Sequence, residues 1–157
     1  MKSIATTLFA IYIIGCRDPS AEIPTPMTSA KYKIGQVWNY QTRKGEEQSR
    51  IFIVRADSNQ KIGTIYHIYI DGLQIRNPHT NTGIQDHLPH SPVSEKTLND
   101  SVTSLAIEHA DEVPDVSDGY KTWKEAFDKG EGGIFTIPVN QIIQHIEDII
   151  TGKRDNG

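Results

Sequence analysis

The 157-residue chain contains one cysteine, so no disulfide can form within it. Basic side chains are in the minority, with 16 Lys and Arg against 20 Asp and Glu, and the formal net charge is −4. This balance argues against nucleic-acid binding, which needs a basic face. The one long apolar run, residues 4–14, is shorter than the roughly twenty residues that cross a bilayer core. A domain formed by this chain must therefore be held together by its own apolar core.

The sequence also lacks the short motifs of familiar chemistries. G-x-S-x-G, H-E-x-x-H, a phosphate loop and a Gly-rich dinucleotide turn are all absent. Gly119 and Glu125 have the spacing of the sixth and twelfth positions of a calcium loop. Its first and third positions would be Pro114 and Val116, however, which offer no carboxylate. These absences favour a protein without chemistry of its own.

The N-terminal residues have the parts of an export signal in order. Lys2 supplies a short positive region, residues 4–14 are uncharged, and the small residue Gly15 precedes Cys16. This aliphatic-aliphatic-Gly-Cys pattern resembles the lipobox of bacterial lipoproteins, which signal peptidase II cleaves. The resemblance implies cleavage after Gly15 and a diacylglycerol on Cys16, usually joined by an N-acyl chain. That covalent lipid is the only bound group we expect.

The same resemblance leads to the expected domain organisation. Residues 1–15 are a signal peptide, 16–30 the lipidated cysteine and a flexible tether, 31–151 a single soluble domain and 152–157 a frayed tail. The tether contains three prolines and four Ser or Thr residues, a composition that buries little apolar area. Arg17 follows the cysteine in place of the aspartate associated with inner-membrane retention. We therefore expect a protein anchored in the outer membrane and facing the periplasm.

Three segments near the start of the domain have the composition of strands. Residues 36–42, 49–56 and 63–70 are rich in β-branched and aromatic side chains, and polar turns separate them. They predict an antiparallel meander. Residues 51–54 are all apolar, so both faces of that strand are expected to be covered, as in a central strand.

Three helices are predicted after the meander. The first begins at an N-cap, Ser94, and carries Leu98, Val102 and Leu105 on one side. The second runs from about Ser117 to a stop at Gly130 and presents a core stripe of Tyr120, Trp123 and Phe127.

The last helix has the clearest pattern. We expect Thr136 to cap it after a short strand over residues 134–137, and Gly152 to end it. Its apolar face comprises Val139, Ile142, Ile143, Ile146, Ile149 and Ile150. The predicted fold class is α+β: a small antiparallel β-meander followed by three helices, with the C-terminal amphipathic helix packed on the sheet.

Histidines gather in one segment, residues 77–92, which is expected to be an irregular loop. His79, Asp86, His87 and His90 are residue types that bind metals, yet they have neither a helical spacing nor the full ligand count of a zinc signature. A polar surface loop is the preferred interpretation, with no metal bound. His67, between two apolar strand residues, is expected to be a packed or cross-strand polar side chain.

Two classes of function remain open. The first is a membrane-anchored periplasmic lipoprotein that acts as a non-enzymatic binding, inhibitor or envelope-associated module. Its partners would be the lipid bilayer, through the acyl anchor, and a protein of the envelope, with no nucleic acid. Within this class an immunity-type protein, an assembly factor and a small-ligand binder are all compatible with the sequence. The alternative is a metal-dependent periplasmic hydrolase that uses the histidine-rich segment 79–90.

Overall fold

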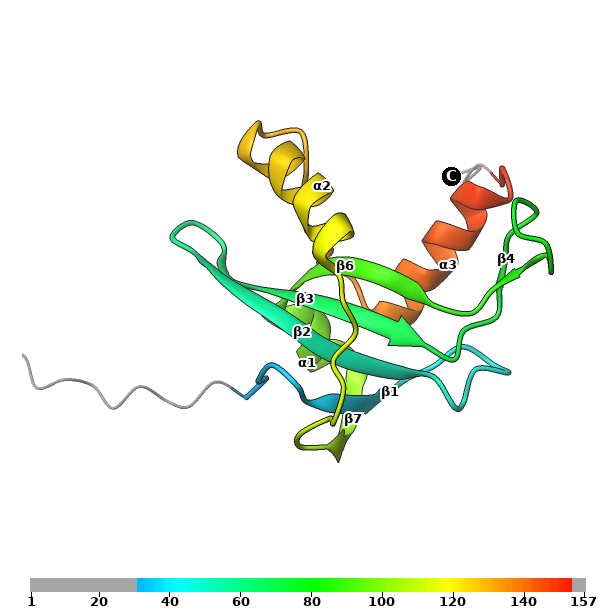
Figure 1. Ribbon diagram of the computed structural model, residues 1–157, viewed down its shortest axis with the longest axis horizontal. Helices are drawn as coiled ribbons and strands as arrows, with labels where there is room; N and C mark the ends of the chain where they lie inside the picture. The colour runs from blue at the N-terminus through cyan, green and yellow to red at the C-terminus, as the bar shows by residue number, and fades with distance from the viewer. Residues whose placement is uncertain (1–30, 154–157) are drawn as a thin grey trace, which may run out of the picture.

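A computed structural model describes residues 31–153 of the chain. Three predicted features lie outside the described residues: the signal peptide, the lipidation of Cys16 and the tether up to residue 30. Residues 154–157 lie outside them as well. The described part is an α+β domain, and the predicted fold class is confirmed, including the C-terminal helix packed on the sheet (Figure 1).

The main sheet has five antiparallel strands in the order β6-β3-β2-β1-β7. The predicted meander is confirmed as the strands β1, β2 and β3. Strand β2 is central, with β1 on one side and β3 on the other. A second, two-stranded sheet pairs β4 with β5. The strands are β1 (Val37–Tyr40), β2 (Arg50–Asn59), β3 (Gly63–Asp71), β4 (Ile75–Arg76), β5 (Ile84–Gln85), β6 (Leu88–Ser94) and β7 (Val102–Ile107).

The predicted loop over residues 77–92 is wrong in its second half, because residues 88–94 form the edge strand β6. Pro89 and Pro92 conceal this strand in the sequence, since proline is uncommon inside strands. An edge strand tolerates proline because one of its sides has no partner to receive a hydrogen bond. The opposite edge, β7, pairs with β1 in a register that is interrupted twice. Both edges of the sheet are thus poorly suited to adding a further strand.

Helix α1 (Glu95–Ser101) begins where the sequence predicts, and the Ser94 hydroxyl accepts a hydrogen bond from the Thr97 backbone N–H at 3.1 Å. The helix ends earlier than predicted. Val102 and Leu105 belong to β7, which returns along β1. An apolar residue every three or four positions fits one face of a helix, but Val102 is β-branched and favours a strand, so the spacing alone misassigned this segment.

Helix α3 (Val139–Ile150) buries Val139, Ile142 and Ile143, whereas Ile149 is 65% exposed, contrary to expectation. Thr136 does not cap this helix; the residue at that position is Pro138, whose side chain accepts nothing. The Ser101 hydroxyl of α1 instead accepts the Val139 N–H at 2.9 Å. The predicted strand over residues 134–137 is reduced to a single bridge with β6.

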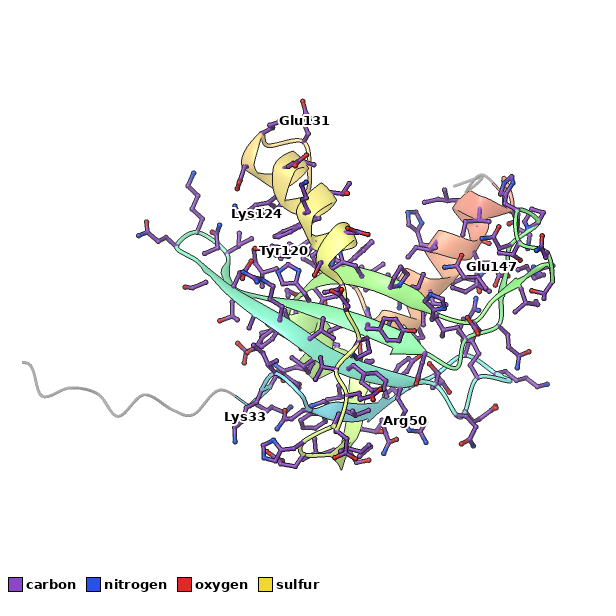
Figure 2. All side chains as sticks on the ribbon, viewed as in Figure 1. Lys33, Arg50, Tyr120, Lys124, Glu131 and Glu147 are labelled. Atoms are coloured by element: carbon purple, nitrogen blue, oxygen red, sulfur yellow. The ribbon has the colours of Figure 1, made fainter. Side chains whose placement is uncertain are left out.

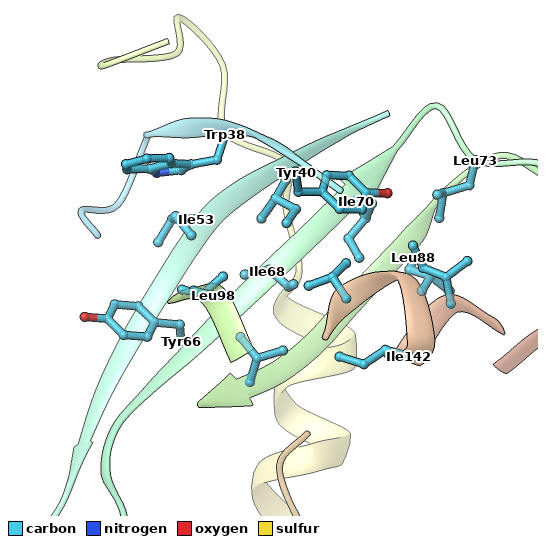
Figure 3. Packing of buried hydrophobic residues seen from close by; sticks show 14 of the residues in the cluster. Trp38, Tyr40, Ile53, Tyr66, Ile68, Ile70, Leu73, Leu88, Leu98 and Ile142 are labelled. Atoms are coloured by element: carbon cyan, nitrogen blue, oxygen red, sulfur yellow. The ribbon is translucent and has the colours of Figure 1, made fainter. Parts of the chain in front are cut away.

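The apolar core lies between one face of the sheet and the pair α1 and α3 (Figure 3). Alternate residues of the central strands supply it, including Ile53, Ile68 and Ile70, all 0% exposed. Leu98 of α1 and Ile142 of α3 close it from the other side. None of the helices of residues 31–153 has the length and apolarity to cross a bilayer.

The remaining helix, α2 (Ser117–Asp128), contributes nothing to this core and has no buried residue. The chain reaches it from β7 by crossing the sheet on the side opposite α1 (Figure 1). Glu131, just past the end of this helix, lies away from the sheet, whereas Tyr120 lies where the helix meets the sheet (Figure 2). The stripe predicted as core on this helix is therefore only half-buried.

Candidate functional site

We call the sheet face opposite the core the outer face. Strand alternation decides which residues belong to it: Tyr66, Ile68 and Ile70 join the core, so Ile65, His67 and Tyr69 point the other way. The outer face has two parts. One lies under α2, and the other carries half-buried side chains beyond it.

The part under α2 contains a pair of stacked imidazoles. His67 of β3 is 0% exposed, and its Nδ1 lies 2.9 Å from Nε2 of His90 on β6. The two ring centroids are 5.1 Å apart with an interplanar angle of 13°. Antiparallel pairing places Pro92 opposite His67, which brings His90, two residues away, onto the same face. The predicted packed, cross-strand position of His67 is confirmed.

Asp57 of β2 lies at the other end of the His67 ring. Its carboxylate accepts a hydrogen bond from Arg55 Nε at 2.9 Å and another from the Tyr120 hydroxyl of α2 at 2.8 Å. His67 Nε2 is 3.4 Å from the same carboxylate oxygen that Tyr120 uses. The Arg55 guanidinium lies 4.0 Å from the centre of the Tyr120 ring, a cation–π contact.

Helix α2 is seated on these groups by ring contacts and one close backbone approach. The rings of Tyr120 and Trp123 meet His67 edge-on, with centroids 5.0 and 4.7 Å away. Gly119 lies directly on His90, and a Cβ added to it would be 2.7 Å from that residue's Cβ. Trp123 also donates its indole N–H to the Gly133 carbonyl at 2.8 Å, which ties α2 to the segment after it.

The two imidazoles are neutral at pH 7. Burial, followed by the neighbouring His90, lowers the pKa of His67 to about 4 despite the opposing effect of Asp57. Burial also lowers the pKa of His90. For Asp57, burial raises the pKa, but the Tyr120 hydrogen bond and the Arg55 charge outweigh it, so the pKa ends below its ordinary value. The pair is therefore uncharged beside an ionised carboxylate.

Beyond α2, the outer face carries three rings in contact that we call the aromatic patch: Phe52, Tyr69 and His87. Phe52 of β2 meets Tyr69 of β3 edge-on at 5.9 Å, and the His87 ring stacks on Tyr69 at 5.5 Å. All three side chains are half-buried. His87 is held by Asp86, whose carboxylate lies 2.6 Å from its Nδ1.

A hollow of about 270 Å³ lies beside the N-terminal end of α2. Arg55 and Tyr120 form one side of it, and Ile34, Val54, Pro114 and Val116 supply most of its apolar lining. Val54 belongs to the outer face of β2, so the segment leading to α2 lies against that face at this point.

The structure does not unite the four residues of the predicted histidine-rich segment. His79 is exposed in the turn after β4, Asp86 and His87 pair with each other, and His90 is turned to His67. Within residues 31–153, no three His, Cys, Asp or Glu side chains are placed to hold a metal ion together.

The pairing of His67 with His90 is not predictable from the sequence. The one usable signal is a histidine between the apolar residues Tyr66 and Ile68 of a predicted strand. Its partner lies in a segment whose prolines hide a strand, so no register could be assigned to it. Comparison with protein-family models, curated proteins and solved structures gave no match to this chain.

Proposed function

We propose that this protein is a lipid-anchored module of the bacterial cell envelope that binds a protein partner and carries out no chemistry of its own. The observation that carries the binding role is the aromatic patch. Three rings from separate parts of the chain lie against one another, Phe52 edge-on to Tyr69 and His87 stacked on Tyr69, and remain half-exposed. Aromatic side chains held in fixed positions are enriched in the centres of protein interfaces, because they bury a large area at little entropic cost.

The sheet edges support recognition through side chains on the outer face. An extended peptide adds to a sheet only where an edge strand offers a regular row of backbone groups. The prolines of β6 and the two register shifts of β7 interrupt that row on both sides of this sheet. We therefore place the contact on the outer face and its rings, not on an added strand.

The proposed location rests on the lipobox-like residues 13–16, which lie outside the described residues. An acyl anchor on Cys16 and a tether of residues 17–30 would hold the domain within reach of the membrane surface. Two acyl chains or more give stable anchoring, where one gives only marginal binding. A partner in the envelope is then the natural target for the aromatic patch.

Site-specific crosslinking in intact cells tests the binding role. The photoreactive residue p-benzoylphenylalanine would replace Tyr69 in one variant and Gln60 in a matched control. Gln60 is exposed in the turn between β2 and β3, far from the patch along both strands. We expect illumination to give a discrete larger adduct from position 69 and none from position 60.

A second variant, Tyr69→Ala, should remain folded by circular dichroism. It should no longer retain the purified partner that the wild-type domain retains. Failure to obtain an adduct from position 69, with the protein present at its normal level, would contradict the proposal.

A further inference from the structure

We propose that α2 is a lid whose closure over the outer face is controlled by protonation of the paired imidazoles of His67 and His90. The lid is closed while both rings are neutral and opens when the pair takes up a proton. This inference does not depend on which partner the aromatic patch binds.

The lid can leave the sheet without disturbing the core. No residue of α2 is buried, and the core packs on the opposite face of the sheet. The helix is also bounded by segments that can absorb a rotation. Residues 108–116 precede it without regular structure, and Gly130 follows it with φ +75°. The contacts of α2 with the outer face include those with His67, His90, Asp57 and Arg55.

The contact between the imidazoles requires a particular protonation state. At 2.9 Å, one of the two nitrogens must donate and the other must accept. A doubly protonated pair would direct two N–H groups at each other, and a single added proton places a cation in a site that closed α2 shields from water. His67 is fully buried in the closed state, so water cannot solvate that charge until α2 moves.

The neighbouring groups do not offset the cost of burying the added charge. Asp57 lies 3.4 Å from His67 Nε2 and favours a protonated ring, but burial and the neighbouring His90 outweigh its effect on the pKa of His67. The same carboxylate accepts hydrogen bonds from Arg55 and Tyr120, and the Arg55 charge lowers the pKa of His67 further. The remaining charged group facing this cluster from α2 is Lys124, a cation that is already paired with Asp128.

The direction of the pH dependence follows from the imidazole. The pKa of His67 is about 4 in the closed state, against 6.5 for an ordinary histidine, so the open state binds the proton more readily. Closure is therefore most favoured above pH 6.5 and weakens as the pH falls below it. Between these two values the closed-to-open ratio should fall about tenfold per pH unit.

Fluorine NMR of the full-length chain labelled with 5-fluorotryptophan tests the lid directly. The chain has two tryptophans: Trp123 lies on the lid, and Trp38 lies in the core as an internal reference for global unfolding. Trp123→Phe assigns the two resonances. On lowering the pH from 7.5 to 4.5, we expect the Trp123 resonance to move toward that of free 5-fluorotryptophan while the Trp38 resonance stays in place.

Variants identify the group responsible. The double variant His67→Gln/His90→Gln should hold the Trp123 resonance constant over the same pH range, whereas His79→Gln, at an exposed histidine outside the cluster, should keep the wild-type response. Simultaneous movement of both tryptophan resonances, or a pH response that persists in a folded double variant, would overturn the proposal. If the double variant does not fold, nitrogen NMR of the imidazoles in the wild type provides the test. Protonation of His67 near pH 6.5 without movement of the Trp123 resonance would contradict the proposal.

Discussion

At the scale of single residues, one buried carboxylate joins three parts of the chain. Glu147 of α3 is 5% exposed and accepts hydrogen bonds from Arg43 Nη1 at 3.0 Å and from Arg76 Nε at 3.1 Å (Figure 2). Arg43 also donates to Glu46, whose carboxylate accepts the Gln74 backbone N–H. The network thereby attaches α3 to the turn after β1 and to the short β4–β5 sheet.

Glu147→Gln should lower the free energy of unfolding by about 1.5–3 kcal/mol at pH 7, the usual contribution of hydrogen bonds to a charged group. Burial raises the pKa of Glu147, but the hydrogen bonds from Arg76 and Arg43 outweigh it and bring the pKa below its ordinary value. The wild-type advantage is therefore present above pH 4.5 and lost as the pH falls further. Urea denaturation at pH 7 and pH 3.5 measures it.

The matched control is Glu131→Gln, at an exposed glutamate beyond the end of α2. It should change stability by no more than about 0.5 kcal/mol. An equal loss in the two variants, or a loss in Glu147→Gln that does not shrink in acid, would show that the network is not stabilised by the ionised carboxylate.

At the scale of secondary structure, elements with one buried face were predictable from the sequence, and elements at the edges were not. β2 and α3 were predictable because each places a group of apolar side chains in the core: Ile51 and Ile53 from β2, and Val139, Ile142 and Ile143 from α3. The helix predicted through Val102 and Leu105 fails because its apolar spacing fits an edge strand equally well. The cap predicted for α3 fails because a hydroxyl from another helix, on Ser101, takes that role.

The apolar face of α3 gives a prediction with its control on the same helix. Ile142→Ala should lower the free energy of unfolding by about 2–5 kcal/mol, because Ile142 is 0% exposed and its removal leaves a cavity in the core. Ile149→Ala should cost less than about 0.5 kcal/mol, since that side chain is 65% exposed. Thermal unfolding of both variants distinguishes them. Equal losses would mean that α3 is rotated from the orientation described here.

In helix α2, a Gly→Ala substitution at Gly119 should have the opposite of its usual effect. Gly→Ala inside a helix normally stabilises it by up to about 1 kcal/mol. At Gly119, however, the new methyl group would be 2.7 Å from the Cβ of His90, so α2 must shift away from β6. Gly119→Ala should therefore expose Trp123 to an added quencher at pH 7 while the melting temperature changes little. Gly133→Ala, where no atom lies within 4 Å of the added carbon, should leave quenching unchanged.

At the scale of the whole molecule, the packing of sheet and helices around the core was easier to predict from the sequence than the candidate site on the outer face. The core side of the sheet follows from alternation and from α3, because burial leaves a periodic trace in the sequence. The outer face depends on which residues of β3 and β6 lie side by side, and that register cannot be obtained from either segment alone. The same limit explains why Tyr120 and Trp123 were predicted as core: a half-buried lid and a buried helix have similar apolar stripes.

The anchor gives the last prediction, which concerns where the whole domain is held. Cys16→Ser removes the thiolate that would accept diacylglycerol, and a hydroxyl is a far weaker nucleophile at neutral pH. Labelled palmitate should therefore enter wild type and not the variant. The variant should also keep residues 1–15 and run larger on a gel, since signal peptidase II acts only on the lipidated precursor.

Globomycin should make wild type accumulate as a larger precursor that still carries the label. Protease acting within the tether, residues 17–30, should release a folded domain from membranes, because residues 31–153 form their own core. Wild type that takes up no palmitate and whose mature chain does not begin at residue 16 would remove the anchor. The partner of the outer face would then have to be sought away from the membrane surface. The lid experiment would still be valid, because it depends only on the contacts of His67 and His90 with α2.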